Sequence, residues 1–240
     1  MSAQLLLGDC LEGMAAMVDR SVDHVITDPP FSEHVHDKLG TEARSDGAQW
    51  RDALTFSALT EEMARTVAAE ACRVAKRWIV IFCDERSISR WDSAITTAGG
   101  LFVRGGVWVK TDAMPQMTGD RPAAGTESII VAHAPRPKKG GRMKWNGGGR
   151  PATWIGPIRG VNAEERQHPT QKPMWLMEAL VKDFTDPGDL ILDPFAGSGS
   201  TLVAAIRNGR RGIGFELDPG YHAIATKRLG YTREQRTLAL

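Results

Sequence analysis

The amino-acid sequence predicts an α/β fold in which a mostly parallel sheet is covered by helices on both faces. Two observations indicate this class. Short apolar runs alternate along the chain with segments whose apolar residues recur at helical spacing, as in strand–helix units. Two unusual turns, DPPF at 28–31 and DPFAGSGS at 193–200, each follow an apolar run. Ligands bind at the carboxyl ends of parallel strands, so both turns are expected to face one pocket.

The first half of the chain contains three expected strands and three expected helices. The strand at 22–27 ends at two prolines, which lack a backbone N–H and cannot continue a ladder. The helix at 60–75 has apolar residues at steps of three and four, and Thr60 is a suitable N-cap. Residues 32–57 are polar without periodicity and are expected to form a long functional loop. The other expected elements are strands at 3–8 and 77–83 and helices at 10–18 and 87–99.

The second half is expected to begin with one antiparallel hairpin and to continue with further strand–helix units. The two strands of the hairpin are expected at 101–110 and 127–133. Residues 134–160 are rich in Gly, Pro and basic residues, contain no acid, and include Trp145 and Trp154. After them come the motif HPTQKP at 168–173, helices at 174–184, 201–209 and 219–229, and strands at 189–193 and 210–216.

The bulk composition predicts a single cytoplasmic domain. A length of 240 residues suits one compact domain, here expected to span 1–240. The net charge is only +1, so a polyanionic partner must be met by a local basic patch. The three cysteines are an odd set without CxxC spacing, which favours reduced thiols over a disulfide framework or a metal site. We find neither a signal-peptide pattern nor an apolar run of membrane-spanning length.

The stretch LILDPFAGSGSTLVAA has the pattern of a strand, a tight turn and a helix, and indicates a cofactor site. Gly197 and Gly199 allow the backbone to approach a ligand, and a helix N-terminus follows. Glu216 ends the next strand, about 20 residues further on, where doubly wound folds bind ribose hydroxyls. A dinucleotide turn needs a third glycine where Leu202 stands, and Asp193 would repel a pyrophosphate but suit a sulfonium. These features favour S-adenosylmethionine over NAD; the alternative is a glycine turn without a ligand.

The motifs taken together resemble a known family. DPPF, HPTQKP, DPFAGSGST and GFELDP, in this order, are similar to the motifs of the β-class amino-group DNA methyltransferases. The resemblance runs from GDC at 8–10 to the final helix, and the combination is far more specific than any one motif. It implies a circularly permuted, seven-stranded, Rossmann-like methyltransferase sheet that binds S-adenosylmethionine. It also implies double-stranded DNA as the partner and is compatible with a homodimer.

The same resemblance implies which residues contact the cofactor. Asp9 would meet the adenine amino group, although it could equally be the N-cap of the following helix. Thr170 and Lys172 would reach the cofactor carboxylate, while His168 is expected to be structural. Phe195 would line the methionine end of the cofactor, and its alternative place is the core. The full set of expected cofactor-binding residues is Asp9, Cys10, Asp28, His168, Thr170, Lys172, Asp193, Phe195, Gly197, Gly199 and Glu216.

The turn DPPF would hold the target base and carry the catalysis. An exocyclic amino nitrogen is a poor nucleophile because its lone pair is delocalised into the ring. Acceptors on Asp28 and on the carbonyl of Pro29, whose direction Pro30 helps to fix, would localise that lone pair for direct attack on the methyl group. The base would first be flipped out of the duplex and stacked on Phe31. No covalent intermediate, and therefore no nucleophilic cysteine, is expected. The alternative is a rigid turn whose Phe lies in the core.

The basic stretch would contact DNA. By the resemblance, a target-recognition insertion is expected here, at 134–167, and its basic residues would bind phosphates in a salt-dependent manner. The alternative is a solvated basic loop. His34, His36 and Lys38 follow DPPF and would close over the flipped base; the two histidines lack the companions that a metal site needs. The expected DNA-binding residues are Arg136, Lys138, Lys139, Arg142, Lys144, Trp145 and Arg150.

The residues favour adenine N6 as the methyl acceptor, with cytosine N4 as the alternative. In the family that the chain resembles, Asp at the first position of the turn is more often associated with adenine, and Ser with cytosine. Further alternatives are transfer to RNA or to a glutamine amide, for which a similar turn begins with Asn. A non-catalytic nucleic-acid-binding subunit would be expected to have broken motifs, whereas Asp28 and the glycine turn are intact.

Overall fold

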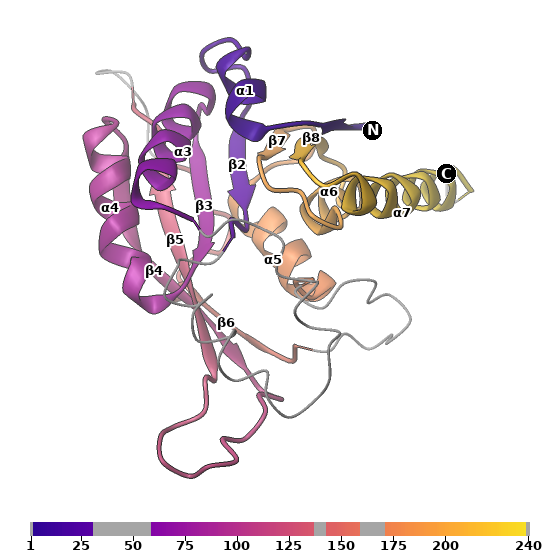
Figure 1. The fold of residues 1–240 in the computed structure, drawn as a ribbon. Coiled ribbons are helices and arrows are strands. Elements are labelled where there is room, and N and C mark those ends of the chain that lie inside the picture. The colour runs from indigo at the N-terminus through magenta and orange to yellow at the C-terminus, as the bar shows by residue number, and fades with distance from the viewer. Residues whose placement is uncertain (1, 31–58, 137–142, 159–170, 239–240) are drawn as a thin grey trace.

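The computed structural model describes residues 2–30, 59–136, 143–158 and 171–238, which form one sheet with helices on both faces (Figure 1). The strand order is β1-β8-β7-β2-β3-β5-β4-β6. Neighbours from β1 to β3 are parallel, β5 is antiparallel to β3 and β4, and β6 is parallel to β4. The strands are β1 (Ala3–Leu7), β2 (His24–Thr27), β3 (Trp78–Cys83), β4 (Leu101–Lys110), β5 (Thr126–His133), β6 (Thr153–Gly156), β7 (Leu190–Asp193) and β8 (Arg211–Glu216).

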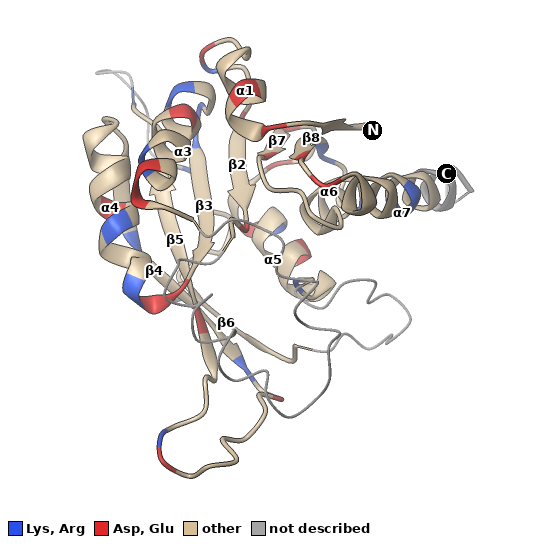
Figure 2. Cartoon of the chain, in the orientation of Figure 1, with Lys and Arg blue, Asp and Glu red and all other residues tan. Residues whose placement is uncertain are grey.

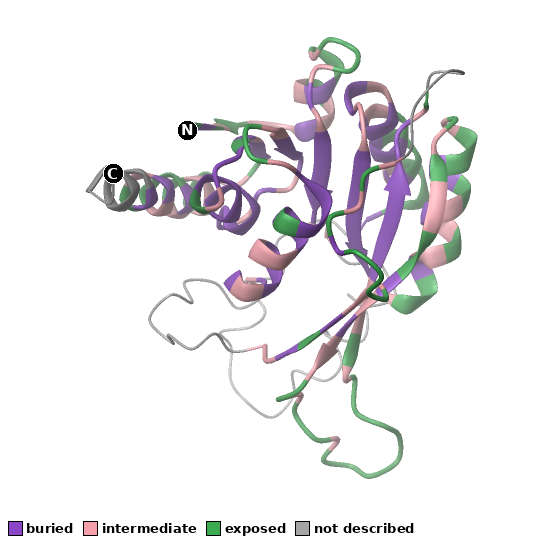
Figure 3. Cartoon of the chain, turned by 180° about the vertical axis from the view of Figure 1, so that it is seen from behind, coloured by how far each residue is buried: buried purple, intermediate pink, exposed green. Residues whose placement is uncertain are grey.

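The helices form two layers, and each layer buries its own apolar cluster against the sheet. One face carries α1 (Cys10–Ala15), α3 (Glu61–Val74), a 3-10 turn (Glu85–Ser87) and α4 (Ile88–Thr97); the other carries α5 (Met174–Phe184), α6 (Ser200–Arg207) and α7 (Pro219–Leu238). Successive residues of β3 alternate between the clusters, with Ile79 and Ile81 on the first side and Val80 and Phe82 on the second. The central strands are therefore buried on both faces (Figure 3).

Helix α3 begins where the sequence predicts. The hydroxyl of Thr60 accepts a hydrogen bond from the backbone N–H of Met63 at 3.1 Å, which is the geometry of an N-cap. The apolar positions Ala64, Val67 and Ala71 then recur along one face and are fully buried. This confirms the predicted cap and the predicted amphipathic helix.

The predicted fold class is confirmed, and the sheet of the described residues has one strand more than expected. Each expected strand and helix is present apart from shifts at its ends; α1 is shorter and α7 longer than predicted. The additional strand, β6, lies inside the basic stretch. Trp154 of β6 stands opposite Trp108 of β4, and both indoles are buried. Burial of these two rings outweighs the low strand propensity of the surrounding Gly and Pro residues.

Strand β8 and helix α6 approach closely where a dinucleotide turn would have its third glycine. Leu202 is fully buried there. A Cβ added at either Gly212 or Gly214 of β8 would lie 2.8 Å from a methyl group of Leu202. The glycines that allow this close packing are therefore on the strand, and a leucine can occupy the helix position.

The described part of the chain shows further general features that bear on function. Acidic and basic residues are interspersed over its elements, in keeping with the small net charge (Figure 2). None of its helices is long and apolar enough to cross a membrane. Cys10, Cys72 and Cys83 are unpaired and buried. Burial raises the pKa of Cys72 to about 11 and the pKa values of Cys10 and Cys83 to about 12, so these thiols are neutral at physiological pH.

Candidate active site

Strands β2 and β7 bring the two unusual turns to the same edge of the sheet. The strands are parallel neighbours, with Val25 opposite Leu192. At their carboxyl ends, the hydroxyl of Thr27 donates a hydrogen bond to Oδ1 of Asp193 at 2.7 Å. Asp28 follows Thr27 directly, and the glycine turn follows Asp193. Two motifs that are far apart in the sequence therefore meet at one edge of the sheet.

Asp193 is a buried carboxylate held by several donors. Besides Thr27, the backbone N–H of Phe195 donates to its Oδ1 at 3.1 Å, and the side chain of Thr201 is a further partner. Burial raises the pKa of Asp193 to about 6, against the effect of these hydrogen bonds. The group is consequently ionised at neutral pH and becomes neutral in mild acid.

The two glycines of the turn have different tasks. Gly197 and Gly199 both have positive φ, 51° and 81°, which side chains rarely adopt. A Cβ on Gly197 would meet open space, whereas one on Gly199 would lie 3.0 Å from the Cβ of Ala225 in α7. Gly197 therefore leaves room for a ligand, and Gly199 lets α7 pack against the start of α6.

Glu216 joins the glycine turn to the ends of β8 and β1. Its buried carboxylate accepts backbone hydrogen bonds from Gly197 at 2.7 Å and from Asp218 at 2.8 Å. Burial raises its pKa above the ordinary value. The backbone N–H of Gly8 donates to the Glu216 carbonyl at 2.9 Å, so Asp9 lies at the same edge of the sheet. Asp9 is the N-cap of α1, which confirms that prediction.

A row of alternating charges extends from Asp28 across β5 to β4. The Nζ atom of Lys172 lies 2.9 Å from Asp28 Oδ2 and 2.5 Å from Glu127 Oε1. Glu127 Oε2 in turn lies 3.1 Å from the Nζ atom of Lys110. The Lys172 side chain is only 8% exposed, and its ammonium lies 4.9 Å from the centroid of the Phe82 ring. These side chains form one connected charge network at the carboxyl edge.

The network controls the ionisation of its members. Burial raises the pKa of Asp28 to about 6; Lys172 opposes this shift and Glu127 adds to it. Burial of the Lys172 ammonium would lower its pKa, but the two carboxylates outweigh burial and raise it above the ordinary value. Burial would raise the pKa of Glu127, but Lys172 and Lys110 outweigh it and lower that pKa. At neutral pH all four groups are therefore charged.

A small hollow lies beside Asp28. Pro29 and Pro30 line it on one side, together with Cys83 at the end of β3 and Trp91 of α4. The Asp28 side chain is 29% exposed, although the Lys172 that binds it is buried. Asp28 can therefore meet a group that enters from outside while Lys172 holds it from within.

The charge network differs from the sequence-based expectation for Lys172. The motif HPTQKP implies a contact of Lys172 with the cofactor carboxylate, whereas the structure pairs it with Asp28 and Glu127. Glu127 and Lys110 were not predicted as site residues because neither belongs to a motif. The available signal was a charged residue at the start of the otherwise apolar run ESIIVAH, on the strand after the one that ends at Lys110.

The described end of the basic stretch binds acidic residues of the protein itself. Lys144 lies 2.7 Å from Asp186, and Arg150 lies 2.5 Å from Asp183. The indole ring of Trp145 packs 4.9 Å from the last aromatic ring of α5. Both acids are near the end of α5 and before β7, so these contacts lie at the amino edge of the sheet, opposite Asp28.

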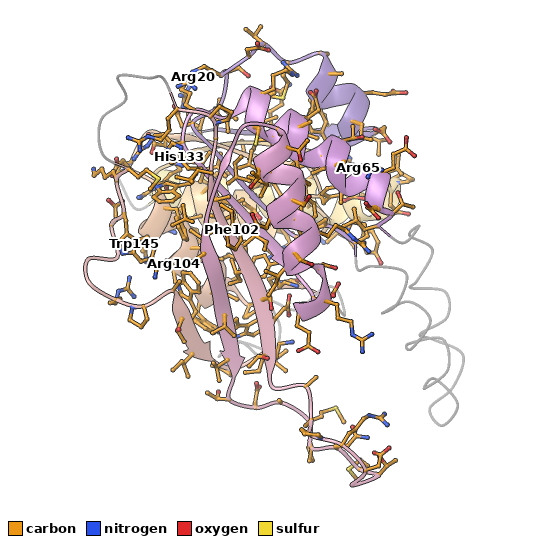
Figure 4. The ribbon with its side chains drawn as sticks, turned by 90° about the vertical axis from the view of Figure 1, so that its left-hand side faces the viewer. Arg20, Arg65, Phe102, Arg104, His133 and Trp145 are labelled. Carbon is orange, nitrogen blue, oxygen red and sulfur yellow. The ribbon has the colours of Figure 1, made fainter. Side chains whose placement is uncertain are left out.

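This placement does not support the predicted DNA contacts of Lys144, Trp145 and Arg150. Figure 4 shows Trp145 on the same flank as Arg104 of β4 and His133 of β5. The physical reason is that β5 runs antiparallel to β3 and returns the chain to the amino edge before the basic stretch begins. Arg136 is exposed and follows the end of β5 at that edge.

The remaining predicted residues are partly outside the described residues. Cys10 is buried at the start of α1, and Phe195 is half-buried against the cluster that α1, α3 and α4 cover. The predicted residues that lie outside the described part of the chain are Phe31, His34, His36, Lys38, Lys138, Lys139, Arg142, His168 and Thr170.

Comparison of the sequence with known proteins identifies a family and full-length relatives. The model of the DNA methylase family (N6/N4 methyltransferases) matches residues 22–227. The putative methylase YubD of Escherichia coli K12 is 32% identical over 234 residues, which are 95% of this chain and 90% of that protein. The type II methyltransferase M2.DpnII of Streptococcus pneumoniae is 28% identical over 94% of this chain and 88% of its own length.

Solved structures share the fold. The complex of M1.HpyAVI with S-adenosylmethionine superimposes with a TM-score of 0.66 at 27% identity, covering 95% of this chain and 98% of the other. A DNA modification methylase of Thermus thermophilus, TTHA0409, also in complex with S-adenosylmethionine, gives 0.65 at 23% identity, with 96% and 94% covered. The cytosine-N4-specific PvuII methyltransferase gives 0.68 at 18% identity, with 95% and 86% covered. The last two likenesses concern the fold alone.

The residues at the carboxyl edge fit S-adenosylmethionine, the cofactor of this family. Buried carboxylates at Asp193 and Glu216 can face a sulfonium and ribose hydroxyls, and the open side of Gly197 leaves space between them. The family match covers most of the chain, and the relatives are matched over nearly their whole length. The chain therefore belongs to the DNA methylase family and is an S-adenosylmethionine-dependent amino-group methyltransferase that acts on DNA.

Proposed function

We propose that this protein methylates the exocyclic N6 of adenine in double-stranded DNA, after flipping the target base out of the duplex. The observation that supports this most is the placement of Asp28, a partly exposed carboxylate beside a hollow, at the edge that also carries Asp193 and the glycine turn. Aspartate at the first position of the DPPF turn is the feature that favours adenine over cytosine.

In this proposal Asp28 and the carbonyl of Pro29 accept hydrogen bonds from the two amino hydrogens of the base. This draws the nitrogen towards tetrahedral geometry and localises its lone pair. Holding the nitrogen in line with the methyl group contributes on the order of 7–11 kcal/mol in well-oriented systems. Phe31 would stack on the flipped base, and such stacking contributes roughly 1–3 kcal/mol.

The cofactor would be held by the residues that follow β7 and β8. S-adenosylmethionine supplies a methyl group on a cationic sulfur, which is the electrophile of the reaction. Asp193 would face this positive charge, Glu216 would accept hydrogen bonds from the ribose hydroxyls, and Asp9 would meet the adenine ring. Once the nitrogen carries the methyl group it must lose a proton, and Asp28 is the nearest ionised acceptor that can pass the proton to water.

A labelling experiment tests the choice of acceptor. The protein would be incubated with methyl-labelled S-adenosylmethionine and unmodified genomic DNA, and the DNA digested to nucleosides. We expect the label on N6-methyladenine nucleoside. Label on N4-methylcytosine would establish the alternative that the fold of the PvuII enzyme represents, and DNA without label would reject methyl transfer to DNA. Because M2.DpnII is a type II methyltransferase, we further propose a role in restriction–modification.

The role of Asp193 predicts a pH-dependent affinity for the cofactor. The pKa of Asp193 is about 6, so protonation in mild acid removes the charge that would face the sulfonium. We therefore expect the dissociation constant of S-adenosylmethionine, measured by calorimetry between about pH 5 and 8, to rise as the pH falls through the pKa of Asp193. Replacing Thr27 by Val removes a hydrogen bond that favours the ionised form. We expect this change to move the midpoint to higher pH.

The matched control for Thr27→Val is Thr66→Val on the exposed side of α3, where the hydroxyl donates only to the Glu62 carbonyl of its own helix. The control should keep the wild-type midpoint. Equal midpoints in the wild type and Thr27→Val would show that Asp193 does not control the binding.

A further inference from the structure

We propose that Glu127 and Lys172 form a positioning pair that orients the carboxylate of Asp28 and gives the catalytic end of the pocket a net negative charge. The inference rests on the proposed function, in which Asp28 receives the amino group of the target base. It assigns a task to Glu127, which belongs to no recognised motif, and a different task to Lys172 from the one its motif implies.

The geometry fixes one oxygen of Asp28 and leaves the other available. The ammonium of Lys172 holds Oδ2 at 2.9 Å. Lys172 cannot readily move away, because Glu127 lies 2.5 Å from the same nitrogen and the Phe82 ring lies beneath it at 4.9 Å. With Oδ2 held from the buried side, Oδ1 can turn towards an incoming amino group. Such support from a second layer of residues keeps a catalytic group in a productive orientation.

The balance of charge explains why Lys172 needs a second acid. Asp28 and Lys172 alone would be neutral together, and a cation beside the reacting nitrogen would oppose the positive charge that develops there. Glu127 adds a negative charge, so the three groups together carry one net negative charge at neutral pH. Lys110 binds the far oxygen of Glu127, and its side chain is more exposed than those of Glu127 and Lys172. A net negative end of the pocket suits both a sulfonium and a nitrogen that becomes cationic.

A purely structural role is a poor explanation for this pair. Buried ion pairs stabilise a fold little compared with apolar side chains of similar size. The three groups also come from three separate elements, β2, β5 and the segment before α5, and converge at the edge that carries the glycine turn. The charged or titratable groups that act on Asp28 or are acted on by it are Lys172, Glu127, Lys110, Asp193 and Cys83.

The test compares Glu127→Gln with Lys172→Met. We expect each change to lower kcat for methyl transfer by up to about 100-fold, because the carboxylate loses its fixed orientation. The acid limb of the kcat–pH profile should move in opposite directions. Loss of the Glu127 charge makes Asp28 easier to ionise and moves the limb to lower pH. Loss of the Lys172 charge makes Asp28 harder to ionise and moves the limb to higher pH, and Lys172→Arg should restore part of the wild-type behaviour.

Two further measurements separate the inference from its alternatives. The dissociation constant of S-adenosylmethionine should stay within about threefold of wild type in both variants, a change of well under about 1.4 kcal/mol. A large loss of affinity in Lys172→Met with kcat preserved would overturn the inference and place Lys172 at the cofactor carboxylate. The control is Glu178→Gln on α5, an acid that pairs with Lys182 and Arg207 away from Asp28 and should leave the profile unchanged.

An activity-independent measurement distinguishes failure of this inference from failure of the proposed function. Carbon-13 NMR titration of the Asp28 carboxyl group should show the same opposite shifts in the two variants. If the wild type transferred no methyl group to DNA, the proposed function would fail while these shifts could still support the pair. Unchanged titration and unchanged kcat in folded Glu127→Gln, checked by its melting temperature, would overturn the pair whatever the substrate.

Discussion

Replacing Asp28 by Asn should lower the rate of methyl transfer by about 100- to 1,000-fold, while cofactor binding stays measurable. The substitution keeps the size of the side chain and removes its negative charge. Asn presents an amide NH₂ where the base amino group needs an acceptor, and it cannot take up a proton from the methylated nitrogen. Single-turnover transfer of a labelled methyl group would measure the rate, and calorimetry would measure the affinity for S-adenosylmethionine.

The matched control for this substitution is Asp92→Asn on α4, whose carboxylate accepts a hydrogen bond from Thr96 of its own helix. It should transfer methyl groups at the wild-type rate. An Asp28→Asn protein that reacts within threefold of wild type would remove Asp28 from the reaction. A protein that no longer binds the cofactor would instead assign Asp28 to the cofactor site.

Replacing Glu216 by Gln should weaken S-adenosylmethionine binding by roughly 10- to 100-fold, the loss expected for a hydrogen bond to a charged group. Both oxygens of Glu216 already accept backbone hydrogen bonds, one from the glycine turn and one from Asp218. An amide NH₂ in place of one oxygen must face one of these N–H groups. The substitution therefore disturbs the turn and removes the charge that would face the ribose.

Two measurements separate these effects of Glu216→Gln. The melting temperature without cofactor reports the damage to the turn, and kcat at saturating cofactor should remain close to wild type because Glu216 lies away from the reacting nitrogen. Glu12→Gln, an acid in the first turn of α1, is the control and should bind normally. Normal affinity in Glu216→Gln would exclude a role for this carboxylate in cofactor binding.

Most of the secondary structure could be predicted because its signals are local. The apolar spacing and the Thr60 cap define α3, and the prolines after Thr27 end β2. Strand β6 was missed because its sequence is short and surrounded by Gly and Pro. Its stability comes from Trp154, which packs beside Trp108 of a strand far away in the sequence. A window of local sequence does not contain that partner.

The sequence by itself determined the family, the cofactor and the positions of Asp28, Asp193 and the glycine turn at strand ends. These features depend on short motifs and on parallel strands, whose carboxyl ends always share an edge. Only the tertiary structure decided that Lys172 binds Asp28 and Glu127, and that Lys144 and Arg150 bind acids at the opposite edge. The physical reason is that a long charged side chain selects its partner by proximity in space, and the antiparallel course of β5 sets which groups are near.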